Sequence, residues 1–153
     1  MAINKRILGL DIGGRRIGTA LSDPLGILAS PHSIIERRDD ESAIKAISEL
    51  ASQHDIGRIV VGLPLSLDGN EGQQAARVKA FTTGIEAAVD IPLEYKDERL
   101  STVTANELLK QGGGKKTRGA DDAAAAAVIL QSYLEEKSPY QLNDEDLTEF
   151  GNQ

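Results

Sequence analysis

Residues Leu8 to Asp23 read LGLDIGGRRIGTALSD, a stretch that predicts a buried strand with a carboxylate at its end, followed by a glycine turn. The nearly continuous apolar run over residues 7–12 is typical of a strand covered on both faces. Asp11 interrupts this run, and it should be paired, hydrogen-bonded or bound to a metal, because burying a lone carboxylate is costly. Gly13 and Gly14 predict a tight turn that leaves space beside the carboxylate. A turn-forming aspartate is the alternative interpretation.

Length and composition favour one domain with one sizeable core, since the chain has 153 residues and 40% of them are hydrophobic. The absence of cysteine excludes disulfides, zinc–thiolate sites and thiol catalysis. Aromatic residues make up only 3% of the chain and tryptophan is absent, which argues against a platform for stacked bases. We expect a cytoplasmic protein without membrane contact, because no signal-peptide pattern and no apolar run of about 20 residues occurs.

The net charge of −7 is unusual for a protein that contacts nucleic acid. Four acids and no basic residue fall in the segment 138–153, so residues 1–137 carry a net charge of only −3. We therefore expect one domain over 1–137 and an acidic, mobile tail over 138–153. The charge disfavours a nucleic-acid partner without excluding it.

The order of the expected elements is β-β-β-α-β-α-β-α-α, which predicts an α/β sandwich around a mixed five-stranded sheet. Alternation and apolar runs predict the strands, and helical spacing of apolar residues predicts the helices. The expected strands are 7–12, 17–21, 31–36, 58–63 and 91–96, and the expected helices are 39–54, 71–88, 102–111 and 122–136.

Acidic residues recur at the ends of these expected core elements: Asp11 at the end of the first strand, Glu98 after the last strand, and Asp121 and Asp122 at the start of the last helix. Strand ends and helix starts gather on one rim of such a sheet, so these acids could converge there. Clustered carboxylates favour a hard cation, and Mg²⁺ takes one or two of them with waters and phosphate oxygens. Each acid also has a plain structural alternative, such as a helix N-cap for Asp121 or Asp122.

Basic residues follow the same acids along the chain, and Lys and Arg neutralise backbone phosphates. The candidates for substrate binding are Arg15, Arg16, Arg99, Lys115, Lys116 and Arg118. The last three belong to a glycine-rich segment, 111–119, which could equally be a solvated linker with incidental charge.

The motifs LGLD at 8–11, RIGTA at 16–20, VGLP at 61–64, DERLST at 97–102 and the alanine-rich segment after Asp122 resemble the YqgF/RuvX family over residues 5–136. The resemblance implies an RNase H-like, RuvC-like fold and a nuclease that matures the 5′ end of pre-16S ribosomal RNA. It also implies that Asp11, Glu98 and Asp122 are the catalytic residues and the metal ligands. Asp68 or Glu71 could replace Glu98, because RuvC-type enzymes take their central acid from the strand that corresponds to residues 58–63.

The mechanism that follows is hydrolysis of a phosphodiester by two Mg²⁺ or Mn²⁺ ions about 4 Å apart, bridged by Asp11. The resemblance implies products with a 5′ phosphate. Alternatives are a Holliday-junction resolvase acting on branched DNA, a non-catalytic ribosomal RNA assembly factor, and an actin-like ATPase, which would need a second domain. A resolvase needs two sites related by a two-fold axis, so the sequence leaves monomer and homodimer open.

Overall fold

The computed structural model describes residues 5–65, 72–97 and 118–137. The expected helix over 102–111 and the acidic tail therefore lie outside the described residues. The strands are β1 (Arg6–Ile12), β2 (Arg16–Ser22), β3 (Ala29–Glu36), β4 (Ile56–Leu63) and β5 (Leu93–Asp97). The helices are α1 (Asp40–Gln53), α2 (Gln73–Ala88) and α4 (Arg118–Lys137).

The five strands form one mixed sheet, as the sequence predicts, and the structure shows their order to be β3-β2-β1-β4-β5. β1, β2 and β3 pair antiparallel through short connections, whereas β4 and β5 add in parallel on the other side of β1. The carboxyl ends of β1, β4 and β5 consequently lie side by side on one rim of the sheet.

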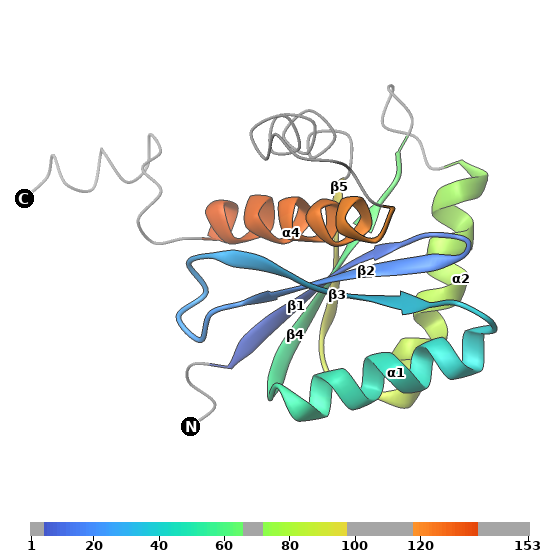
Figure 1. Cartoon of the computed structure of the whole chain (residues 1–153), viewed down its shortest axis with the longest axis horizontal. Helices are drawn as coiled ribbons and strands as arrows, with labels where there is room; N and C mark the ends of the chain where they lie inside the picture. Colours follow the sequence, from blue (N-terminus) through green and yellow to red (C-terminus); the bar gives the residue numbers. More distant parts are fainter. Residues whose placement is uncertain (1–4, 66–71, 98–117, 138–153) are drawn as a thin grey trace, which may run out of the picture.

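Helices cover both faces of this sheet (Figure 1). α1 and α2 pack on one face over a core that includes Leu8, Leu10, Ile59 and Val61. α4 crosses the other face over a second core built around Ala20, Val60 and its own Leu130. Burial on both faces explains the apolar composition of β1 and β4.

Side-chain hydrogen bonds hold the N-terminus of α1 and the C-terminal part of α4. The Asp39 carboxylate accepts a hydrogen bond from the backbone N–H of Ser42 at 2.7 Å and caps the N-terminus of α1. Near the C-terminal end of α4, the hydroxyl of Tyr133 donates a hydrogen bond to Glu94 of β5 at 2.6 Å. The guanidinium of Arg58, in β4, donates to both the Tyr133 hydroxyl and the Glu94 carboxylate. Burial of Tyr133, followed by its hydrogen bond to Glu94, raises the pKa of the phenol.

Asp23, which precedes Pro24 in the sequence, lies in the turn between β2 and β3. One of its carboxylate oxygens accepts hydrogen bonds from the N–H groups of Ile27 and Leu28 at 2.7 and 2.8 Å. These backbone N–H groups, Leu28 first, lower the pKa of Asp23.

Candidate functional site

Asp11 lies near the carboxyl end of β1, on the face of the sheet that α4 covers. Gly9, two residues earlier on the same face, is so close to α4 that an added Cβ would be 2.8 Å from the Cβ of Leu130. Because side chains alternate along a strand, Asp11 faces α4 while Leu8 and Leu10 enter the other core. Asp11 as a residue is half-buried and interacts with other groups of the protein.

Gly18 of β2 is the direct cross-strand partner of Asp11. The backbone of Asp122, in the first part of α4, rests on this glycine, and a Cβ at position 18 would overlap the carbonyl oxygen of Asp122. Asp11 and Asp122 are 111 positions apart in the sequence, yet both are neighbours of Gly18, Asp11 as its strand partner and Asp122 through its backbone. The structure therefore brings two of the three acids expected from the sequence to one place.

Arg16, at the start of β2, closes the glycine turn, since its carbonyl accepts a hydrogen bond from the N–H of Gly13 at 2.9 Å. Its Nε is 3.3 Å from the Oδ2 of Asp122, and the side chains of Arg16 and Asp122 are 29% and 34% exposed. The cation thus offsets one carboxylate of the site and restricts the direction of its oxygens. Arg15, the neighbouring residue, is exposed in the turn.

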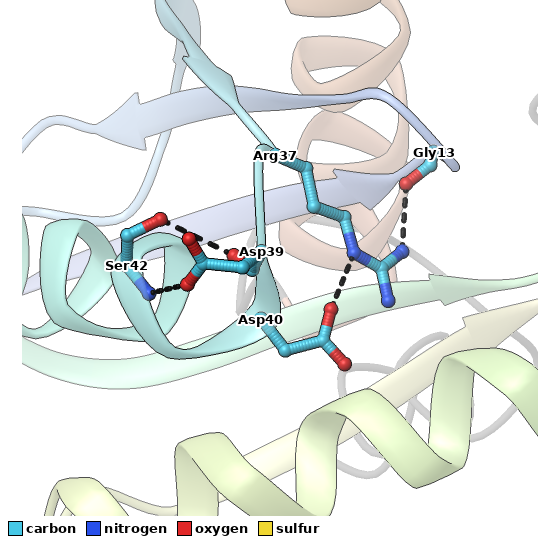
Figure 2. Close-up of polar contacts among 5 residues, drawn as sticks. All are labelled: Gly13, Arg37, Asp39, Asp40 and Ser42. Carbon is cyan, nitrogen blue, oxygen red and sulfur yellow. Dashed lines mark hydrogen bonds and ion pairs between the residues drawn. The ribbon is translucent and has the colours of Figure 1, made fainter.

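The turn that follows Asp11 is held by Arg37, a residue that none of the sequence motifs includes. Its guanidinium donates to the carbonyl oxygen of Gly13 at 2.8 Å and to the carboxylate of Asp40 at 3.0 Å, and Figure 2 shows both contacts. The N–H of Arg37 also donates to the carbonyl of Arg15 at 2.8 Å, and the guanidinium lies 4.4 Å from the centroid of the Phe81 ring. The adjacent arginines at 37 and 38, directly before a helix cap, were the signal available in the sequence.

The end of β5 also lies on this rim, since Asp97 pairs with Leu63 at the end of β4. Leu63 belongs to the core under α1 and α2, so the register places Asp97 on the face opposite Asp11. Lys96, in contrast, lies on the α4 face, where its ammonium is 2.6 Å from Glu136.

The remaining candidates fall where no side chain is described. Glu98, Arg99, Lys115, Lys116, Asp68 and Glu71 lie outside the described residues. Arg118 and Asp121 belong to the first turns of α4, and only their backbone is described. Among the described residues, no three histidine or acidic side chains form a group that could hold a metal ion. None of the described helices is long and apolar enough to cross a membrane.

The sheet order and the helices on both faces define an RNase H-like α/β fold. RuvC from T. thermophilus, solved in complex with a Holliday junction substrate, superposes with a TM-score of 0.57 at 15% identity over 88% of this chain and 96% of that chain. The fowlpox virus resolvase, solved with Holliday junction DNA, gives a TM-score of 0.57 at 12% identity over 87% and 99% of the two chains. At these identities the likeness shows the fold alone.

Residues 5–136 match the model of the RuvX family, described as Holliday junction resolvase, and the chain belongs to this family. A relative from Dehalococcoides mccartyi is 44% identical over 128 residues, which cover 84% of this chain and 96% of the relative. A second, from Synechococcus elongatus, is 44% identical over 132 residues, or 85% and 89% of the two chains. Both carry the name "Putative pre-16S rRNA nuclease".

Proposed function

We propose that this chain is a metal-dependent nuclease that hydrolyses phosphodiester bonds at the 5′ end of pre-16S ribosomal RNA. The observation that carries the proposal is the approach of Asp122 to Asp11 across Gly18, at the rim where the parallel strands end. The names of the relatives support pre-16S ribosomal RNA as the substrate. Such a substrate would place the protein in the cytoplasm.

The donors at this rim fit a hard divalent cation. Asp11 and Asp122 offer carboxylate oxygens from two adjacent elements, and Mg²⁺ binds through one or two carboxylates together with waters and substrate phosphate oxygens. We assign these two residues, with Glu98 as the third acid, as ligands of Mg²⁺ or Mn²⁺. The bound cation would activate water and stabilise charge on the phosphate and the leaving oxygen.

The protein's own cations have two separate roles in this proposal. Arg16 holds the carboxylate of Asp122 in a fixed direction through their ion pair. Backbone phosphates of the substrate are neutralised in this proposal by Arg15, Arg99, Lys115, Lys116 and Arg118. We propose that the nuclease domain comprises residues 1–137 and that the acidic segment 138–153 is not required for the chemistry of the site.

Cleavage of branched DNA is the second candidate. The fold shared with RuvC and the description of the family favour it. A junction resolvase must place two active sites across a two-fold axis, so this function requires a homodimer. A monomer that cuts RNA would exclude it.

The test compares wild-type protein with Asp11→Asn on an end-labelled pre-16S leader RNA and on a four-way DNA junction, with Mg²⁺ or Mn²⁺. We expect RNA cutting by the wild type only, with both proteins equally folded by circular dichroism. Paired cuts in the junction would instead identify a resolvase. Undiminished cutting by a pure Asp11→Asn preparation would refute the site, and no cutting of either substrate by folded wild type would favour an RNA-binding assembly factor.

A further inference from the structure

A cavity of about 490 Å³ lies beside the glycine turn that follows Asp11. Its walls come from the β1–β2 turn, the β3–α1 connection and α2, and they include Gly14, Arg38, Arg77 and Phe81. Asp11 faces α4, whereas this cavity borders α1 and α2, so the turn separates the two. This cavity is not part of the carboxylate site.

Most of the charge around the cavity is already neutralised within the protein. Arg37 is paired with Asp40 and bound to the carbonyl of Gly13 (Figure 2). Asp39 caps α1 through the N–H of Ser42 and thereby offsets the positive end of the helix dipole. The two acids in the wall therefore have structural partners of their own.

Arg38 and Arg77 are different, because both are exposed and neither forms an ion pair within the part of the chain that the structure describes. They come from different elements, the β3–α1 connection and α2, and they line the same cavity. Two arginines that share a cavity without a carboxylate partner form a site for an anion. The planar guanidinium groups suit the oxygens of a phosphate, which they can bind in a bidentate manner.

The described walls of the cavity lack a surface on which a base could stack. Phe81, the aromatic residue among them, is only 2% exposed, and the guanidinium of Arg37 already lies over its ring. The chemistry therefore fits the backbone of a nucleic acid rather than its bases.

We propose that Arg38 and Arg77 form an accessory subsite for a backbone phosphate of the nucleic-acid substrate, on the far side of the glycine turn from the scissile bond. The inference rests on the proposed function, because it assumes that a polyanion reaches Asp11 and continues across the turn. Exposed Arg15 on that turn extends the positive charge between the two sites.

The test measures binding of a fluorescent leader RNA by anisotropy in EDTA, where the RNA cannot be cut by a metal-dependent route. The double variant Arg38→Gln/Arg77→Gln is compared with wild type and with the matched control Lys5→Gln/Lys45→Gln, which removes the same charge from exposed positions outside the cavity. We expect the cavity variant to bind about tenfold more weakly, with a slope of log affinity against log salt smaller by about one to two. The control should retain wild-type affinity within about twofold.

Cleavage by the same proteins in Mg²⁺ separates the two proposals. The subsite is overturned if wild type cuts the RNA while the two double variants bind it with equal affinity and equal salt slopes. The nuclease assignment stays intact in that case. If wild type neither binds nor cuts the RNA or a DNA junction, both proposals are overturned. Weaker binding by the cavity variant, with its thermal unfolding unchanged, supports the subsite whichever nucleic acid is cut.

Discussion

The carbonyl oxygen of Asp122 lies directly against the α-carbon of Gly18, the residue that pairs with Asp11 across the first two strands. This contact sets how closely the start of α4 approaches β2, the strand that pairs with β1. It exists because glycine has no side chain, so the helix can approach the sheet at this point as closely as backbone atoms allow. The two candidate ligands depend on it for their proximity.

Gly18→Ala should disrupt this contact, because the added methyl group would overlap the Asp122 carbonyl. We expect a loss of about 1–3 kcal/mol in the free energy of unfolding, measured in urea, as for other overpacked sites. Cleavage should fall further than this loss explains, since the start of α4 must shift. Gly14→Ala is the control for stability, because a Cβ added there would meet no described atom within 4 Å beyond its chain neighbours, and it should change unfolding by less than about 0.5 kcal/mol. Equal effects of the two variants would contradict the prediction.

Arg16→Gln removes the cationic partner of Asp122. The pair is partly exposed, so unfolding should change by less than about 1 kcal/mol. The turnover rate should nevertheless fall about 10- to 100-fold and the Mg²⁺ concentration needed for half-maximal cleavage should change, because the carboxylate loses its fixed orientation. Arg16→Lys should restore part of the activity. A residue with only a structural role would show no change in the Mg²⁺ dependence, and that result would reject the positioning role.

Tyr133→Phe should reduce stability and alter its dependence on alkaline pH. The variant loses the hydrogen bond to Glu94, at a cost of about 1–2 kcal/mol at neutral pH. Burial raises the pKa of the folded Tyr133, so the unfolded chain loses this proton first and the wild type loses stability as the pH rises above about 10. The difference in urea midpoint between wild type and Tyr133→Phe should therefore shrink between pH 9 and 11. A constant difference would show that Tyr133 does not contribute to this pH dependence.

His32 should contribute a loss of stability on mild acidification. Its ring lies edge-to-face with His54 at 4.8 Å between centroids, and burial followed by the charge of His54 lowers the pKa of His32. The unfolded chain therefore takes up this proton first, and stability declines as the pH falls below about 6.5. The urea midpoints of wild type and His32→Gln should be compared from pH 7.5 to 5. They should diverge, because the variant should lose less stability than wild type as the pH falls. Parallel curves would contradict this assignment.

The order and type of the described elements could be predicted from local patterns, but several boundaries depend on partners elsewhere in the chain. β3 begins at Ala29 rather than at the expected residue 31, and the N–H of Ala29 donates to Gln131 of α4. β5 begins at Leu93 rather than at residue 91, because Pro92 has no N–H for the ladder and contributes only its carbonyl, which accepts from Ile59. The first helix begins at Asp40 rather than at the expected residue 39, because Asp39 has an extended backbone and caps the helix with its side chain.

The sequence by itself determined the mixed α/β architecture, the family, and the identity of Asp11 and Asp122 as candidate ligands. It could do so because hydrophobic periodicity, glycine turns and strand-end acids are local features. Only the tertiary structure decided that Gly18 allows Asp122 to approach Asp11, that Arg16 pairs with Asp122, and that Arg38 and Arg77 share a cavity. These relationships join residues from different elements, and their distances follow from packing and strand register, which no local pattern in the chain encodes.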